Sequence, residues 1–244
     1  MIGIFDSGSG GLTVLKEIRQ RLPGADVVYF GDIKNAPYGV KSPEELIALT
    51  AAAIELLKSR GATHIVSACN SVSAALAVSN APTDMIEMIE PTVAAFKQSP
   101  AKILLMATPA TINAEIYQNA FKAIGIGIET LAIPELAGAI EFGQSEADIE
   151  KIISDALAKV DCSSFDTLVL GCTHYPFARA AFQKVLPETT IVDPAIAVAE
   201  KVASSFAEEG GGSTAFLISK DSEPFRNRVQ SLFGATTDMI AVLK

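Results

Sequence analysis

The sequence predicts an α/β fold of two similar lobes, in which mainly parallel sheets are flanked by helices and a candidate active site lies in the cleft between the lobes. Three observations support this prediction. Short apolar segments alternate with longer amphipathic stretches along the chain, as strands and helices do in parallel α/β proteins. Helix starts can be recognised between the apolar segments. One strand-like pattern also occurs twice, about half a chain apart.

The expected strands are short, and most are apolar throughout rather than alternating in polarity. Strands that are buried on both faces of a parallel sheet have this character. We expect them at residues 2–5, 27–30, 64–68, 85–89, 102–107, 167–170, 190–192 and 215–219.

Two helices between these strands have recognisable first turns. Ser42 is followed by Pro43 and, three residues on, by Glu45. This spacing predicts a capping serine with proline at the first helical position. Ser145 and Asp148 predict a second helix start of the same kind.

The repeated pattern consists of HIVSACNS at residues 64–71 and TLVLGCTH at 167–174. In both, an apolar strand ends in a small residue, then a cysteine, then polar side chains. Cys69 and Cys172 are 103 residues apart, so we expect each lobe to place one cysteine at the carboxyl end of a strand, where α/β sheets bind ligands. We expect residues 1–90 and 207–244 to form the first lobe and residues 91–206 the second.

The composition indicates a globular protein. Of 244 residues, 49% are hydrophobic and 19% are charged, which is ample material for a buried core. The formal net charge is −9, and no segment is rich in lysine or arginine. We therefore expect neither nucleic acid nor an anionic membrane as a partner.

The sequence also predicts a cytoplasmic location. No apolar run approaches the roughly 18–20 residues of a membrane span, and the N-terminus lacks the basic segment of a signal peptide. The three cysteines, an odd number, do not form a disulfide framework, so reduced thiols are expected.

A glycine-rich loop, DSGSGG at residues 6–11, follows the first expected strand. Its glycines allow close approach of a ligand, and the next helix start offers unpaired N–H groups to an anion. Thr13 stands where a dinucleotide-binding loop has its third glycine, and no Gly-Lys-Ser/Thr sequence follows, so neither phosphate-loop motif is present. A tight turn capped by Asp6 or Ser7 explains the loop equally well.

The sequence Pro37-Tyr38-Gly39 follows the second expected strand. A rigid corner of this kind can present a phenol and backbone N–H groups to a pocket. Taken alone, an ordinary turn explains it better.

The two cysteines of the repeat are each followed by polar residues, in Cys69-Asn70-Ser71 and Cys172-Thr173-His174. A strand end near a helix N-terminus favours thiolate formation, and the polar neighbours can bind a carboxylate or an amino group. A lone cysteine is usually a small buried hydrophobic residue, but two in matching settings favour a functional pair. Cys162 lacks this setting, and we expect it to be structural.

Other cysteine chemistries fit less well. Cys172 and His174 supply two metal ligands, whereas zinc sites need three or four, and His64 is expected at the start of a strand. No C-x-x-C motif is present, a cysteine protease would leave Cys69 unused, and no lysine has a recognisable pyridoxal phosphate setting. We expect neither a metal nor a cofactor.

Two thiols on opposite sides of a small pocket suit one type of reaction. One removes a proton from a tetrahedral carbon and the other returns a proton to the opposite face, which inverts a stereocentre without a cofactor. A thiol with a pKa near 8.5 is about one tenth ionised at pH 7.5. Asp6 and His174 are candidates to assist one cysteine each, by orienting the thiol or sharing its proton.

Four motifs occur in order along the chain: DSGSGG at 6–11, PYG at 37–39, ACNS at 68–71 and GCTHYP at 171–176. Together they resemble the glutamate racemases of the aspartate/glutamate racemase superfamily. Segments around Glu90, Thr108, Asp193 and residues 216–225 resemble the family as well, so the resemblance covers nearly the whole chain. His174 favours glutamate over aspartate, because the aspartate enzymes typically carry an acidic residue after Gly-Cys-Thr.

The resemblance implies cofactor-independent interconversion of L- and D-glutamate, which supplies D-glutamate for peptidoglycan. It implies that Cys69 acts on the D-enantiomer and Cys172 on the L-enantiomer. It also implies a two-lobed fold, and because members are often dimers, a homodimer is an expectation here. The residues implied to line the substrate site are Asp6, Ser7, Tyr38, Gly39, Asn70, Ser71, Thr173 and His174.

The sequence departs from the family pattern at several positions. Ser71 stands where threonine is usual and keeps the hydroxyl. Lys41 stands where arginine is common, which keeps the charge and loses bidentate geometry. Ile133 replaces a frequent cysteine, and residues 134–138 differ from the usual pattern, although Glu141 matches a family glutamate. These changes concern specificity and regulation more than the type of reaction.

Two alternatives remain. One is a related enzyme with another amino-acid substrate, or a decarboxylase or isomerase on the same fold. Enzymes that protonate a single face need only one cysteine, so the presence of Cys69 and Cys172 argues against them. The other is a non-catalytic binding or regulatory protein, which the set of Asp6, both cysteines and His174 disfavours.

Overall fold

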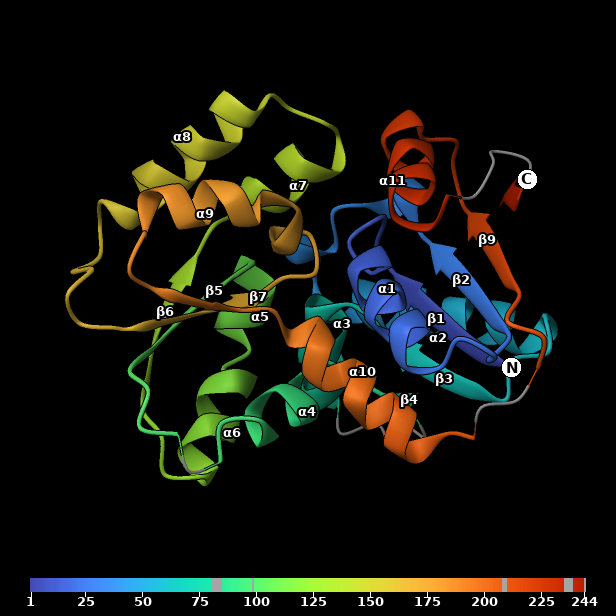
Figure 1. Cartoon of the computed structure of the whole chain (residues 1–244), viewed down its shortest axis with the longest axis horizontal. Helices are drawn as coiled ribbons and strands as arrows, with labels where there is room; N and C mark the ends of the chain where they lie inside the picture. Colours follow the sequence, from blue (N-terminus) through green and yellow to red (C-terminus); the bar gives the residue numbers. More distant parts are fainter. Residues whose placement is uncertain (80–84, 98, 208–209, 235–238, 244) are drawn as a thin grey trace.

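The computed structural model, which describes residues 1–79, 85–97, 99–207, 210–234 and 239–243, contains two sheets in which every strand pair is parallel (Figure 1). The six-stranded sheet has the order β10-β9-β2-β1-β3-β4, and the four-stranded sheet has the order β6-β5-β7-β8. The predicted fold class, two α/β lobes with mainly parallel sheets, is confirmed.

The six-stranded sheet is covered by helices on both faces. Core side chains of α1, α10 and α11 pack on one face, and those of α2 and α3 pack on the other. The strands are β1 (Ile2–Asp6), β2 (Val27–Gly31), β3 (His64–Ser67), β4 (Met85–Ile86), β9 (Thr214–Ile218) and β10 (Ile240–Val242), and the helices are α1 (Leu12–Arg21), α2 (Pro43–Ser59), α3 (Asn70–Ser79), α10 (Pro194–Ser205) and α11 (Glu223–Phe233).

The four-stranded sheet is likewise sandwiched. Helices α4 and α6 pack on one face, and α7, α8 and α9 pack on the other. Its strands are β5 (Ile103–Ala107), β6 (Ile128–Ala132), β7 (Thr167–Gly171) and β8 (Thr190–Val192), and the helices of this part are α4 (Ile89–Ala94), α5 (Pro109–Asn113), α6 (Ile116–Ala123), α7 (Leu136–Glu141), α8 (Glu146–Leu157) and α9 (Arg179–Val185).

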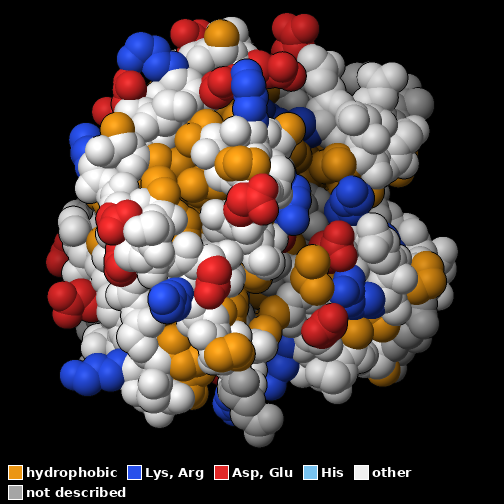
Figure 2. All heavy atoms as spheres, turned by 60° about the vertical axis from the view of Figure 1, so that its left-hand side comes forward, with side chains coloured by type: hydrophobic (Ala, Val, Ile, Leu, Met, Phe, Trp, Pro, Cys, Tyr) orange, Lys and Arg blue, Asp and Glu red, His pale blue; other side chains and the backbone are white. Residues whose placement is uncertain are grey.

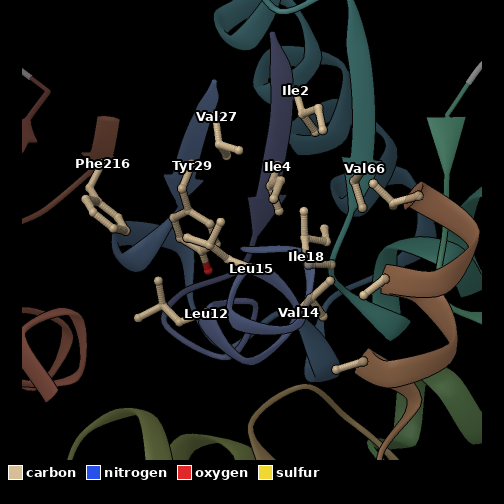
Figure 3. Close-up of a cluster of buried hydrophobic side chains, with 14 of the residues drawn as sticks. Ile2, Ile4, Leu12, Val14, Leu15, Ile18, Val27, Tyr29, Val66 and Phe216 are labelled. Atoms are coloured by element: carbon tan, nitrogen blue, oxygen red, sulfur yellow. The ribbon is translucent and has the colours of Figure 1, made fainter. Parts of the chain in front are cut away.

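The core under α1 leads directly to the glycine-rich loop. Figure 3 shows Leu12, Leu15 and Ile18 of α1 facing the side chains of β1 and β2. These positions recur at three-residue intervals, which is one face of a helix. Tyr29 belongs to this cluster, and its hydroxyl donates a hydrogen bond to the Gly8 carbonyl over 2.8 Å. The core thereby fixes the loop that follows β1.

Both predicted helix starts are confirmed. The Ser42 side chain accepts a hydrogen bond from the Glu45 amide and the Glu45 side chain accepts one from the Ser42 amide, which makes a complete capping box at α2. The Ser145 side chain accepts a hydrogen bond from the Asp148 amide at the start of α8.

All eight predicted strands are present, although β4 is shorter than expected and α4 already begins at Ile89. Two further strands, β6 and β10, were not predicted. Both lie at sheet edges, β6 is only partly buried and β10 has three residues. Neither therefore has the long apolar run by which buried strands are recognised.

The strands of the first sheet come from both ends of the chain, between residues 2 and 86 and between 214 and 242, and those of the second lie between 103 and 192. Helix α10 follows β8 and packs against α1 of the other sheet (Figure 1). The lobe boundaries at 90/91 and 206/207 stay a prediction.

No helix in the described part of the chain has the length and apolar character needed to span a bilayer. Figure 2 shows one face of the molecule, on which acidic and basic side chains are interspersed with exposed apolar ones. That face therefore carries charges of both signs.

Candidate active site

The carboxyl ends of the two sheets meet at a narrow pocket with a cavity volume of about 20 Å³. Cys69 follows β3 and Cys172 follows β7, and both sulfur-bearing side chains line the pocket. The complete lining is Ser7, Ala36, Pro37, Tyr38, Gly39, Cys69, Asn70, Ser71, Thr108, Ala137, Glu141, Cys172, Thr173 and His174.

The structure brings the residues predicted for the site to one place. Nine of them line the pocket, namely Ser7, Tyr38, Gly39, Cys69, Asn70, Ser71, Cys172, Thr173 and His174. The tenth, Asp6, is fully buried beside the pocket and accepts a hydrogen bond from the Thr173 hydroxyl over 3.0 Å. Their proximity is a structural fact, and their individual roles stay predictions.

Cys172 is the end of a chain of polar contacts. Its Sγ lies 3.9 Å from Nδ1 of His174, and Nε2 of His174 lies 2.6 Å from Oε2 of Glu141. The same carboxylate oxygen accepts hydrogen bonds from the Ser9 amide over 3.0 Å and from the Ser9 hydroxyl over 2.6 Å. All four side chains are buried, so the contacts are shielded from water.

These contacts shift the pKa values of His174 and Glu141 in opposite directions. Burial by itself disfavours a charged imidazole, but hydrogen bonds and charge interactions with Cys172 and Glu141 outweigh it and raise the pKa of His174 well above its ordinary value. Burial disfavours the carboxylate of Glu141, but the hydrogen bonds from His174 and Ser9 prevail and lower its pKa. His174 and Glu141 therefore form an imidazolium–carboxylate pair next to Cys172.

Cys69 has different surroundings. Burial, and next the charge of Asp6, raise the pKa of the Cys69 thiol above its ordinary value. Hydrogen bonds from the backbone N–H groups of Ser71 and Val72, in the first turn of α3, act in the opposite direction and favour the thiolate. The helix start therefore partly offsets the cost of ionising a buried thiol.

Asp6 is held between the two lobes. Its Oδ1 accepts a hydrogen bond from the Gly8 amide over 2.9 Å, and Oδ2 accepts the one from Thr173. Burial raises the pKa of Asp6, although the nearby His174 opposes this shift. An acid with a raised pKa close to Cys69 is suited to exchange a proton with that thiol.

The glycine-rich loop is explained by the close approach of the second lobe. A Cβ atom on Gly8 would lie 2.7 Å from the carboxyl group of Glu141. One on Gly10 would lie 2.6 Å from Nδ1 of His174 and 2.6 Å from Oγ1 of Thr173. Side chains at these positions would push Glu141 and His174 away, so the loop needs glycine to let the catalytic candidates of the other lobe approach.

The Pro37-Tyr38-Gly39 corner contributes to the pocket and is not merely a turn. Tyr38 donates a hydrogen bond to Oδ2 of Asp32 over 2.7 Å, which fixes the phenol. A Cβ atom on Gly39 would lie 2.5 Å from Cβ of Thr108, so this glycine too is required by contact between the lobes.

Sequence reasoning missed Asp32 and Ser9 as parts of the site, and Thr108 and Glu141 were noted only as matches to the family. Asp32 directly follows β2. Because α/β sheets bind ligands at the carboxyl ends of their strands, this position was a signal for a site residue. Thr108 follows β5, and its hydroxyl lies 3.1 Å from that of Ser71. Ser9 and Glu141 are 132 residues apart, and no local pattern links them.

Asn70 offers a hydrogen-bond donor to the pocket. Its Oδ1 accepts a hydrogen bond from the Tyr117 hydroxyl over 2.6 Å, while its buried Nδ2 has no partner among the described residues. A buried unpaired amide N–H is costly unless a ligand satisfies it. Asn70 is therefore well placed to donate to a bound anion.

The other histidine and cysteine lie elsewhere. His64 stacks on Phe206 with ring centroids 4.2 Å apart, and Cys162 is exposed on the loop between α8 and β7. Within the described ranges, no three His, Cys, Asp or Glu side chains are grouped as a metal site requires.

A family model described as Asp/Glu/Hydantoin racemase matches residues 2–202 of the chain. The chain belongs to this family. A curated relative, the glutamate racemase of Aquifex aeolicus, is 34% identical over 238 residues, which cover 96% of this chain and 94% of the relative. The similarity to this relative therefore extends over nearly the whole chain, including both sheets.

Solved structures of the family have the same fold. A glutamate racemase isoform from Bacillus anthracis superposes with a TM-score of 0.86 at 28% identity and covers 100% of this chain and 97% of its own. A glutamate racemase from Francisella tularensis in complex with D-glutamate superposes with a TM-score of 0.85 at 26% identity, with the same coverage of both chains.

Proposed function

We propose that this protein interconverts L- and D-glutamate without a cofactor, with Cys69 and Cys172 as the two acid–base residues. The observation that carries the proposal is that two buried cysteines, one from each lobe, line the same small pocket. Each cysteine also has its own titratable neighbour, Asp6 for Cys69 and His174 for Cys172.

The reaction needs one thiolate and one thiol at a time. With L-glutamate, the Cys172 thiolate takes the proton from Cα, and the electron pair is delocalised into the adjacent carboxylate. The Cys69 thiol then donates its proton to the opposite face of Cα, which gives D-glutamate and leaves Cys69 as the thiolate. The reverse reaction exchanges the roles of the two sulfur atoms.

The neighbours of the sulfur atoms match this exchange of protons. His174, whose pKa is raised, lies beside Cys172, so its positive charge is suited to stabilise negative charge on that sulfur during the reaction. Asp6 stands close to Cys69 with a raised pKa, so it is suited to return a proton to Cys69 or to take one from it.

Local hydrogen-bond donors, and not the net charge of −9, must hold the two carboxylates of glutamate. The pocket supplies hydroxyl groups from Ser7, Ser71 and Thr173 and the unpaired amide of Asn70. Such donors bind a carboxylate strongly where water is excluded.

Glutamate as the substrate is supported by relatives that carry this activity in their names, one of which is in complex with D-glutamate. The product would supply D-glutamate for peptidoglycan. A homodimer and a cytoplasmic location also belong to this proposal.

The proposal is tested by incubating the purified protein with L-glutamate or L-aspartate in buffer without added cofactor and separating the enantiomers by chiral chromatography. We expect L-glutamate to approach an equal mixture with D-glutamate, and L-aspartate to react far more slowly. Racemisation of aspartate at a similar rate would remove the assignment to glutamate, and no racemisation of either would support a binding protein.

A further inference from the structure

Arg228 of α11 reaches from the first lobe to the back of the site. Its Nη2 donates a hydrogen bond to the Ile140 carbonyl in α7, and Nη1 donates one to the Ser9 hydroxyl. A second carbonyl, that of Glu141, lies 3.4 Å from Nη1. Helices α7 and α11 face each other across the lobes in Figure 1, and Arg228 connects them.

The guanidinium also forms an ion pair with Glu141. Nη1 lies 3.7 Å from Oε2 of Glu141, the oxygen that contacts both Ser9 and His174. The other oxygen, Oε1, is buried without a hydrogen-bond partner in the described part of the chain. Because a buried carboxylate is unstable unless it is paired, Glu141 depends on its few cationic and hydroxyl contacts.

The orientation of Arg228 is fixed independently of Glu141. The guanidinium carbon lies 4.8 Å from the centroid of the Phe177 ring, a geometry that favours a cation. The side chain is 18% exposed, against 1% for Glu141. A partly exposed, oriented cation therefore lies near the Glu141 carboxylate, whose Oε2 also contacts His174.

We propose that Arg228 is a positioning residue for the Cys172 half of the reaction, acting through Ser9 and Glu141 to hold His174 beside the Cys172 sulfur. This inference rests on the proposed racemase function. Arg228 lies outside the pocket lining. It acts through the series of contacts that runs from Ser9 and Glu141 through His174 to the Cys172 sulfur.

The direction in which loss of Arg228 shifts the pH profile follows from the charges around Glu141 and His174. Glu141 has a lowered pKa and Asp6 a raised one, His174 is the internal cation, and burial raises the pKa of Tyr29 well above its ordinary value, so that its phenol stays neutral. Arg228 adds a positive charge and therefore favours the less protonated form of every neighbour. Removing that charge should therefore move the acid limb of the pH profile to higher pH.

The test compares Arg228→Gln and Arg228→Lys with the unmodified protein across a pH series, using L-glutamate as substrate. For Arg228→Gln we expect kcat/KM to fall about tenfold at neutral pH and its acid limb to move to higher pH by about 0.5–1 unit, as for loss of one nearby charge. Arg228→Lys, which keeps the charge, should restore most of the pH profile.

Arg19 provides the matched control for a purely structural effect. It is a half-buried arginine of the first lobe whose guanidinium binds the backbone of Ala25 and Ser213 and the hydroxyl of Thr214. We expect Arg19→Gln to lower the melting temperature while leaving the pH profile unchanged. Equal shifts in both variants would mean that the effect is one of stability.

The outcomes separate this inference from the function on which it depends. A pH profile of Arg228→Gln that overlays that of the unmodified protein overturns the role of Arg228 and leaves the racemase intact. A profile of Arg228→Lys as displaced as that of Arg228→Gln overturns the electrostatic explanation. Failure of the unmodified protein to racemise glutamate would overturn the proposed function itself.

Discussion

The two cysteine-bearing halves of the pocket resemble each other in sequence and differ in chemistry. Each places a cysteine after a buried parallel strand and before polar residues. Cys172 lies 3.9 Å from a histidine that is paired with Glu141, and Arg228 stands behind that pair. Cys69 has a helix start and the neighbouring Asp6, which together with burial determine its pKa.

The difference shows that an internal repeat fixes where the sulfur atoms lie without making them equivalent bases. The Cys172 half has His174, whose pKa is raised, next to the sulfur. The Cys69 half has an acid near the sulfur, so its thiol form is favoured. The two sulfur atoms therefore have unlike neighbours, an imidazole at Cys172 and an acid near Cys69.

The largest expected effect comes from removing either sulfur. Cys69→Ser and Cys172→Ser should each lower kcat by at least about a thousandfold, since the contribution of a positioned acid–base group is about 10²–10⁴ and a serine hydroxyl is a far weaker acid than a thiol. Chiral chromatography with each enantiomer measures the loss. If either variant kept substantial activity, the two halves would not both be required.

A smaller and asymmetric effect is expected from the two neighbours. Asp6→Asn and His174→Gln should each lower kcat by about 10²-fold, the lower end of the range for general acid–base groups. Because His174 lies next to Cys172 and Asp6 lies near Cys69, we expect the His174 variant to show the larger Cα-deuterium isotope effect with L-glutamate and the Asp6 variant to show it with D-glutamate. The same isotope pattern in both variants would contradict the assignment of one neighbour to each cysteine.

The smallest expected effect concerns stability. The folded state raises the pKa of His174 above its ordinary value of 6.5, so His174 contributes stability that is complete below about pH 6.5 and declines as the pH rises toward the raised value. Urea unfolding at pH 6 and pH 8.5 should therefore show a larger free-energy difference between the unmodified protein and His174→Gln at pH 6. A larger difference at pH 8.5 would mean that His174 is neutral in the folded protein.

Local patterns in the sequence were sufficient to predict the central strands and both cysteines. Strands such as β1 and β7 are buried at every position and mostly apolar, as expected for strands covered on both faces. The two cysteines follow β3 and β7, as predicted. The edge strands β6 and β10 lack this signal. The resemblance to the racemases added the assignment of substrate, which no local pattern supplies.

The connections that tune the site could not be predicted from local patterns. Glu141 lies 33 residues from His174 and Arg228 lies 219 residues from Ser9, so these contacts exist only once the lobes are packed. The same holds for the glycines of the loop after β1, whose need becomes clear from the position of Glu141 and His174.

The central claim, that two different bases act on opposite faces of Cα, is tested most directly by the early time course of L-glutamate racemisation in D₂O, followed by proton NMR after separation of the enantiomers. The account predicts that the first D-glutamate formed carries deuterium at Cα while the remaining L-glutamate keeps its original proton. Deuterium entering both enantiomers at the same early rate, or a proton carried over into the product, would show that one base serves both faces and would contradict the account.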